Sequence, residues 1–258
     1  MIDVYKIRVS KDRLRAMPAD ERSLFILLGY AANQLNLFSK LTLFSLNNTT
    51  EKEPENFLSA AQSQMLLRMA IGVLHEGWTK IITKRLLQTP LGKDYIPRLD
   101  QGGSDALDAL KKLFGSSNIL TSIRNNYAFH HPYDADVEAA FERAASDSNW
   151  DNEWNWFFSR SNFNSFYFVS DIIVMNGIMK EIGEADMFSA QERLMGEVRT
   201  AMNEMTTLIM ALTAAIWRKH FGDALDAEVC AKITGAPGIF EFALPFFVEV
   251  PDGPISGG

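Results

Sequence analysis

The sequence contains few of the residues that build disulfides and metal centres. Among its 258 residues there are one cysteine, Cys230, and four histidines. A single thiol cannot form an internal disulfide or a cysteine-based metal cluster. The chain also has no Gly-x-x-x-x-Gly-Lys phosphate loop, no Gly-x-Gly-x-x-Gly after an expected strand and no His-Glu-x-x-His zinc motif. We therefore expect no metal and no cofactor, and a reducing compartment such as the cytoplasm.

Signals for secretion and membrane insertion are also missing from the sequence. The segment Met1 to Lys6 lacks the apolar stretch of a signal peptide. The longest weakly polar run, Met205 to Trp217, is too short and too rich in threonine to span a bilayer. Apolar residues make up 47% of the chain, enough for a sizeable core. These features predict a soluble globular protein that does not contact a membrane.

The chain lacks the excess of positive charge that non-specific nucleic-acid binders carry. Its formal net charge is −7, and phosphate contacts dominate the affinity of such binders. The charge is unevenly distributed, because eight lysines and arginines oppose four aspartates between Trp78 and Asn125. This local charge of +4 leaves −11 on the remainder of the chain. A small RNA-contact patch is compatible with this mildly basic third.

Helical periodicity of apolar residues runs through most of the sequence and predicts an all-α fold. Two long helices, apolar around most of their circumference, are expected to be buried on most sides. N-caps are expected at Ser104 and within Ser116-Ser117-Asn118, and a loop is expected where prolines and glycines cluster, at 88–103. The expected helices are at about 19–46, 54–87, 105–114, 119–129, 134–145, 171–182, 185–221 and 223–233.

Three segments differ from the helical pattern. A short strand is expected at 4–9, and strand-like alternation recurs in the tail at 239–244. The aromatic stretch 150–168 is expected to form a small hairpin near 119–129, with base stacking as the alternative role of its rings. The predicted organisation is one helical domain, 1–233, and an extended C-terminal tail, 234–258, that packs across the bundle or joins a dimer contact and is disordered from Gly253 on.

Two of the four histidines lie in one short segment, Ile123 to Pro132, together with an arginine. RNA is cut without a metal when its own 2′-hydroxyl attacks the neighbouring phosphate, which requires a general base, a general acid and a cation. An imidazole serves as acid or base near neutral pH, and a guanidinium binds phosphate oxygens with a planar fork. Arg124 and His130 are therefore a chemically sufficient minimum, and Asn125 would orient the histidine or the phosphate.

The spacing of these residues constrains their geometry. On a straight α-helix, positions six apart differ by roughly 120° and by about 9 Å along the axis. Pro132 disfavours helical backbone at His131, so Arg124 is expected inside the helix and the histidines at its end. The alternative interpretation is a helix C-terminus at which cationic side chains are favoured by the helix dipole.

Glu76 is the carboxylate that stands out in the second long helix. It lies among apolar residues, where an unpaired charge is costly. We expect Arg124 as its partner, so that Glu76 holds the arginine or modulates the histidine. The alternative is a structural ion pair with Arg68 or Lys80.

The pattern Arg124-Asn125-x4-His130, with isoleucine before the arginine and Tyr-Ala-Phe-His-His after Asn126, resembles the signature of the HEPN superfamily. This resemblance implies an antiparallel helical bundle and a metal-independent endoribonuclease that acts as a homodimer with the motif at or near the interface. It further implies a toxin or anti-phage effector with an antitoxin or immunity partner. In these roles His130 is the acid or base, Arg124 stabilises the phosphorane and Asn125 positions, while His131 and Glu76 support.

Two other hypotheses remain open. A non-catalytic HEPN-like binding or scaffold protein would keep the motif for structure, and its Arg124 and His130 would be buried and mutually satisfied. An unrelated helical protein would be a monomer with the motif at an isolated helix end. The ribonuclease hypothesis requires both side chains to reach solvent in one cleft.

Overall fold

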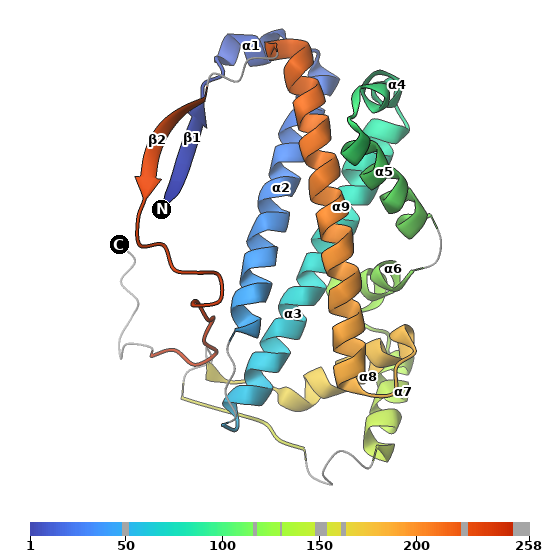
Figure 1. The fold of residues 1–258 in the computed structure, drawn as a ribbon. Coiled ribbons are helices and arrows are strands. Elements are labelled where there is room, and N and C mark those ends of the chain that lie inside the picture. Colours follow the sequence, from blue (N-terminus) through green and yellow to red (C-terminus); the bar gives the residue numbers. More distant parts are fainter. Residues whose placement is uncertain are drawn as a thin grey trace.

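The structure is a computed structural model that describes residues 1–47, 52–115, 118–129, 131–147, 154–160, 164–222 and 227–249. Within these ranges the chain is mostly helical and contains one two-stranded sheet (Figure 1). The predicted all-α class is confirmed at this level. The catalytic candidate His130, the rings of Trp150 and Phe163, and the tail Gly253–Gly258 lie outside the described residues.

Three long helices run side by side and enclose most of the core (Figure 1). They are α2 (Ala19–Leu46), α3 (Glu55–Glu76) and α9 (Met187–Phe221), and α3 continues directly into a π-helical segment, η1 (Gly77–Leu87). The predicted helices at 19–46, 54–87 and 185–221 are thus confirmed. Their fully buried side chains include Leu24, Leu28, Ile71, Leu74, Leu208 and Leu212.

The segment Glu55–Leu87 is, among the described residues, the one helix long and apolar enough by length and composition to cross a membrane. This differs from the expectation, which took Met205 to Trp217 as the longest weakly polar run. In its most apolar window 56% of the residues are buried inside the protein. A core helix of a soluble protein has the same property, and this segment packs against α2 and α9 as the core helix of the bundle.

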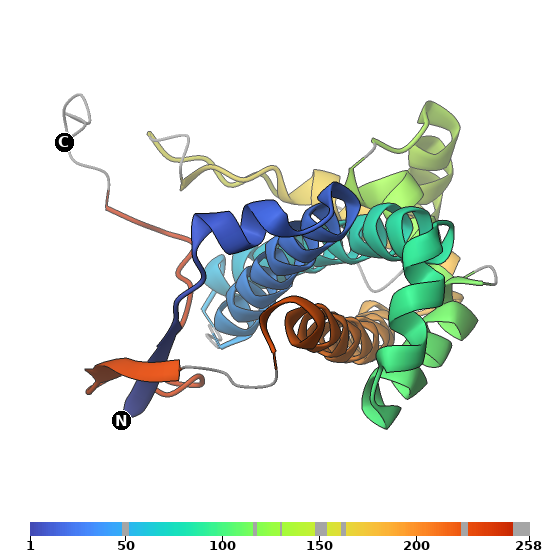
Figure 2. The ribbon, with the colours of Figure 1, turned by 90° about the horizontal axis from the view of Figure 1, so that it is seen from above.

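Shorter helices cover the long ones on the side away from the two termini (Figures 1 and 2). The helix α5 packs along α9, and α7 pairs with α8. The expected motif helix 119–129 divides into a short α-helix, α6, and a π-helical turn, η3. The bounds are α1 (Lys11–Ala16), α4 (Pro90–Tyr95), η2 (Ile96–Arg98), α5 (Gln101–Phe114), α6 (Ile119–Ile123), η3 (Arg124–Ala128), α7 (Asp134–Ser146) and α8 (Phe168–Ile182).

The expected loop at 88–103 is wrong over most of its length. Pro90 occupies the first turn of α4, where its missing N–H is not needed. The helix α5 begins at Gln101, and its N-cap is Asp100, which accepts from the N–H of Gly103, rather than the expected Ser104. Asn118 does cap α6, as expected. Proline and glycine therefore mark helix starts in this region rather than an extended loop.

The expected helix at 223–233 is also wrong, because Ala227–Ile233 form the strand β2. It pairs antiparallel with β1 (Ile2–Ile7), which begins two residues before the predicted strand. Figure 2 shows this ribbon standing beside the helices, and all of β1 is exposed. The tail forms a turn at 239–241 rather than a strand. The tail packs on the end of α2, where the ring centroids of Phe242 and Phe44 are 4.7 Å apart.

The aromatic stretch forms an antiparallel bridge between Phe157 and Phe166, which agrees with a small hairpin. Its predicted position near the motif is wrong. Phe166 packs with Leu58 and Ala61 in the first turns of α3, roughly 20 Å along the helix axis from the turn that contacts the motif segment.

We predict opposite effects for alanine at two neighbouring glycines of α5. A Cβ at Gly103 would lie 2.4 Å from the Cβ of Ala211 on α9, so Gly103→Ala must push the helices apart and destabilise by about 1–3 kcal/mol. A Cβ at Gly102 would make only ordinary contacts at 3.8–4.0 Å, so Gly102→Ala should be neutral or stabilise by up to about 1 kcal/mol. Urea unfolding followed by circular dichroism measures both. Equal stabilities of the two variants would contradict this close packing of α5 on α9.

Candidate functional site

An ion pair joins the segment Ile123 to Pro132, called the motif segment, to the core helix α3. Arg124 Nη2 lies 2.5 Å from Glu76 Oε1, and Arg124 Nη1 donates to Asn125 Oδ1 at 3.0 Å. The side chains of Arg124 and Glu76 are 22% and 34% exposed, so the pair lies at the edge of the protein. Glu76 was expected to pair with Arg124 or, alternatively, with Arg68 or Lys80, and in the structure its partner is Arg124.

The alternative partner, Arg68, is used elsewhere. Its Nη2 lies 2.9 Å from Asp171 Oδ1 on α8, and both side chains are nearly buried, at 10% and 12% exposure. Burial raises the pKa of Asp171, and the charge and hydrogen bond of Arg68 oppose this shift only in part. This buried pair ties α8 to α3 and leaves Glu76 to Arg124.

Two close contacts at glycines hold the motif segment between α3 and α8. A Cβ at Gly72 would come within 2.4 Å of the Phe129 ring, and a Cβ at Gly177 within 2.5 Å of the Tyr127 hydroxyl. Both rings therefore lie directly against a helix backbone. Ser122 adds a hydrogen bond to Glu181 on α8. The motif segment is thus packed between two helices rather than placed at an isolated helix end.

Both members of the Arg124–Glu76 pair lie where an α-helix changes into a π-helix. The segment η1 begins directly after Glu76, and η3 begins at Arg124. π-Helical turns are rare and occur frequently at functional sites. The wider turn also changes the angle between Arg124 and the residues that follow it, so the 120° expected for a straight α-helix does not apply.

His75 is the described imidazole nearest to this pair, and sequence reasoning gave it no role. Burial and the charge of Arg124 lower the pKa of His75, and Glu76 opposes them in part. The ring is therefore neutral at pH 7, and its Nδ1 is buried without a hydrogen-bond partner among the described residues. His131 is exposed. The described part of the site thus comprises Arg124, Glu76, Asn125 and His75.

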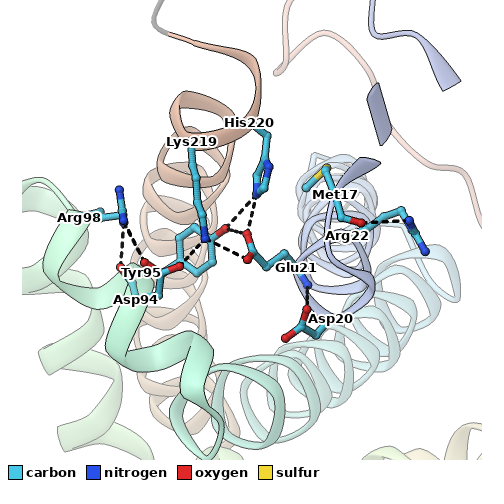
Figure 3. A network of polar contacts seen from close by, with 9 residues as sticks. All are labelled: Met17, Asp20, Glu21, Arg22, Asp94, Tyr95, Arg98, Lys219 and His220. Atoms are coloured by element: carbon cyan, nitrogen blue, oxygen red, sulfur yellow. Dashed lines mark hydrogen bonds and ion pairs between the residues drawn. The ribbon is translucent and has the colours of Figure 1, made fainter. Parts of the chain in front are cut away.

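A second polar cluster lies where the first turn of α2 meets the last turn of α9 (Figure 3). It centres on Glu21, in the first turn of α2. Its Oε2 accepts from the buried Tyr95 hydroxyl of α4 and lies 2.5 Å from His220 Nε2, which must carry the proton to donate. Its Oε1 accepts from Lys219 at 2.9 Å. Lys219 and His220 both come from the last turn of α9, so three helices meet at one carboxylate.

The charges of this cluster stabilise one another. Burial by itself would raise the pKa of Glu21, but hydrogen bonds from Tyr95, Lys219 and His220 outweigh it and hold the pKa below its usual value. Burial and the hydrogen bond to Glu21 raise the pKa of Tyr95. Lys219 also bonds Asp94 at 2.5 Å, which lowers the pKa of that carboxyl. Because both oxygens of Glu21 have partners, we interpret this cluster as a structural clamp.

Sequence reasoning missed this clamp, although it contains a histidine. From the sequence, His220 had no assigned role, and Tyr95 lies in the expected loop at 88–103. The acid in the first turn of α2 and the adjacent cations in the last turn of α9 were visible signals. The sequence does not show that α2 and α9 are antiparallel neighbours, and without this knowledge the two signals could not be assigned to one cluster.

The described residues contain no candidate metal site, and the comparisons with known proteins found no family. Within the described ranges, no group of three or more His, Cys, Asp or Glu side chains is placed to hold a metal ion. No protein-family model matches the chain, and neither a curated protein nor a solved structure matches it. A HEPN assignment therefore depends on the motif alone.

We predict that the Glu21 clamp makes the fold sensitive to acid. The lowered pKa of Glu21 means that its contribution is present above about pH 4.5 and is lost as the pH falls through the folded-state pKa. Tyr95→Phe removes one donor and should lower the free energy of unfolding by about 1–3 kcal/mol at pH 7. The deficit should shrink at pH 4, as measured by urea unfolding at both pH values.

The matched control is Tyr5→Phe, which removes a phenol hydroxyl from a residue that is 61% exposed. It should leave stability unchanged at both pH values. A Tyr95→Phe deficit that stays constant or grows toward pH 4 would show that the hydroxyl does not act through the Glu21 carboxylate.

Proposed function

We propose that this protein is a HEPN-like, metal-independent endoribonuclease, in which Arg124 stabilises the phosphorane and His130 acts as general acid or base. The observation that carries the proposal is the placement of Arg124. Its guanidinium is held by Glu76 at 2.5 Å, remains partly exposed, and lies in a motif segment packed between two helices. A cation fixed in this way can stabilise developing charge without reorganising first.

The proposed reaction requires a general base, a general acid and a cation, which side chains of this protein would supply. A general base takes the proton of the 2′-hydroxyl as its oxygen attacks the neighbouring phosphorus, and a general acid protonates the departing 5′-oxygen. The products are a 2′,3′-cyclic phosphate and a 5′-hydroxyl end. Arg124 remains charged throughout the accessible pH range and binds the phosphorane oxygens. The exposed carboxamide of Asn125 positions the phosphate, with His131 and Glu76 in support.

The ion pair with Glu76 leaves Arg124 able to bind phosphate. Each terminal nitrogen of a guanidinium carries two N–H groups. In Arg124, one from Nη2 goes to Glu76 and one from Nη1 goes to Asn125. One N–H on each nitrogen therefore remains for phosphate oxygens.

A second candidate function is a non-catalytic HEPN-like binding or scaffold protein. The ion pair between Arg124 and Glu76 also favours this candidate. Glu76 offsets the charge of Arg124, whose side chain is only 22% exposed, and the chain carries a net charge of −7. In this hypothesis the pair is a structural link between α3 and the motif segment. The two candidates differ in whether RNA is cut.

The proposal includes a homodimer with the motif at or near its interface, RNA as substrate, and an antitoxin or immunity partner for a toxin or anti-phage effector. Exposed aromatic side chains beside the motif support the dimer, because interface cores are enriched in aromatic residues. Phe129 is 44% exposed and Tyr133 77% exposed.

We predict that the protein is dimeric by size-exclusion chromatography with light scattering, and that Tyr133→Glu shifts it toward the monomer, since a buried charge opposes association. Tyr5→Glu, in the exposed ribbon, is the control and should leave the dimer intact. A dimer disrupted by Tyr5→Glu alone would place the interface at the ribbon instead.

We predict cleavage of RNA by the purified protein in the presence of EDTA. His130→Ala should reduce the rate by about 10²–10⁴-fold through loss of acid–base catalysis. Arg124→Lys keeps a charge opposite Glu76 but loses the planar fork, and should reduce the rate by about 10²-fold or more. Mass spectrometry of the products should show cyclic phosphate ends.

The control Lys111→Ala removes a cation from the same basic third of the sequence without touching the motif, and should retain full activity. Circular dichroism checks that each variant is folded. Absence of cleavage by the wild type across varied RNAs would favour the binding protein. Cleavage that survives both motif substitutions would exclude Arg124 and His130 as the catalytic residues.

A further inference from the structure

A cavity of about 680 Å³ opens between α2, α3 and α9. On α3 it is lined by Leu67 and Ala70, whereas Gly72 and Glu76, which contact the motif segment, lie on the opposite side of that helix, as their spacing at 3.6 residues per turn requires. The cavity is therefore separate from the site at Arg124. Its volume lies in the range of about 300–1,000 Å³ that is usual for small-molecule sites.

The walls of the cavity are aliphatic and follow the helix axis. Leu46, Leu67, Ala70 and Met195 supply apolar surface from all three helices, and none of its lining residues is aromatic. Along α9 the lining extends from Gln191 to Asn203, about 18 Å at 1.5 Å per residue. An elongated aliphatic groove of this kind fits a linear alkyl chain better than a ring system that needs a stacking partner.

The register of α2 against α9 places two polar groups at one end of this cavity. Glu21 contacts His220, and 18 residues further along α2 Ser39 contacts Met202, 18 residues back along α9. Three residues beyond these contacts, Thr42 is therefore level with Arg199, and both line the cavity.

These two polar groups have no partner among the described residues. The Thr42 hydroxyl is buried without a hydrogen bond, which costs free energy unless something satisfies it. Arg199 is exposed and forms no ion pair in the described part of the chain. The other rim charge, Glu192, lies seven residues from Arg199, about 10 Å along the axis. The end at Thr42 and Arg199 is therefore suited to an anion.

We infer that this cavity binds a linear alkyl monocarboxylate. The alkyl chain lies against Leu46, Leu67, Ala70 and Met195, and the carboxylate accepts hydrogen bonds from the Arg199 guanidinium and the Thr42 hydroxyl. The ligand thus covers the apolar walls and satisfies both unpartnered groups. The inference is independent of RNA cleavage, so either can fail without the other.

Gly196 provides a direct way to block the cavity. It lines the cavity, and a Cβ built on it meets no atom within 4 Å, so a larger side chain enters the cavity without striking the backbone. Gly29 on α2 is the matched control, because its Cβ also meets nothing within 4 Å but it does not line the cavity.

Isothermal titration calorimetry of the full chain with decanoate, below its micelle concentration, tests the inference, with decanol as the uncharged comparison. The wild type should bind one decanoate. Gly196→Leu should weaken binding by tenfold or more, and Gly29→Leu should leave it unchanged. Arg199→Gln should weaken decanoate by about tenfold, or about 1.4 kcal/mol, and leave decanol unaffected.

Circular dichroism establishes that each variant is folded before titration. No decanoate binding by the folded wild type, or wild-type affinity in Gly196→Leu, overturns the assignment of the cavity. Equal losses for decanoate and decanol in Arg199→Gln overturn the assignment of Arg199 as the carboxylate partner.

Discussion

The burial of α3 is the constraint on which the rest of the structure depends. This helix is apolar around most of its circumference, yet it carries Arg68 and Glu76 in its second half. Arg68 is nearly buried, and leaving its charge without a partner would cost about 3–5 kcal/mol. Glu76 is partly exposed, so its cost is smaller, but it too has a counter-ion from another segment. Asp171 on α8 and Arg124 in η3 supply these counter-ions. Because Arg68 and Glu76 are eight residues apart, they face the same side of α3, and this side therefore receives both α8 and the motif segment.

The alignment of α2 with α9 is fixed by contacts at one end of the two helices, and it determines which residues lie level with each other further along them. The Glu21 carboxylate has donors from α4 and α9 on both of its oxygens, which fixes how the two long helices align at one end of the molecule. Because helices are stiff, the same alignment brings Thr42 level with Arg199 about six turns away. The clamp thus determines which polar groups meet at the cavity, although it touches neither of them.

Local patterns in the sequence predict most of the helices and the need of Glu76 for a cationic partner. They do not predict structure that depends on contacts between segments far apart in the chain. The bounds of α2 could be predicted because Pro18, its acidic first turn and its apolar periodicity are contiguous. A cationic partner for Glu76 could be predicted because an isolated carboxylate among apolar residues must find a cation, but the sequence did not decide between Arg124 and the alternatives Arg68 and Lys80. In contrast, β2 pairs with β1 across more than 200 residues, as the ion pair of Arg8 with Glu228 illustrates, and no local periodicity reports such pairing. The π-helical turns at Glu76 and Arg124 likewise depend on packing, so their effect on the angles of the site could not be read from the spacing.

The two ion pairs of α3 differ in exposure, and this difference bears on function. The Arg68–Asp171 side chains are 10% and 12% exposed, so separating them would leave charges in the interior and the pair is fixed. A fully exposed pair would be worth only about 0–1 kcal/mol and would hold its arginine in no defined direction. Arg124 and Glu76, at 22% and 34% exposure, lie between these limits. A carboxylate in that environment orients the guanidinium while leaving it within reach of solvent. In the proposed reaction the RNA phosphodiester is a monoanion like the carboxylate, whereas the phosphorane carries more negative charge, so Arg124 would bind the phosphorane more strongly than the substrate. In the proposed function, the intermediate burial of this pair is what would allow Arg124 to bind phosphate as well as link two helices, and it follows from placing Glu76 at the last α-helical turn of α3.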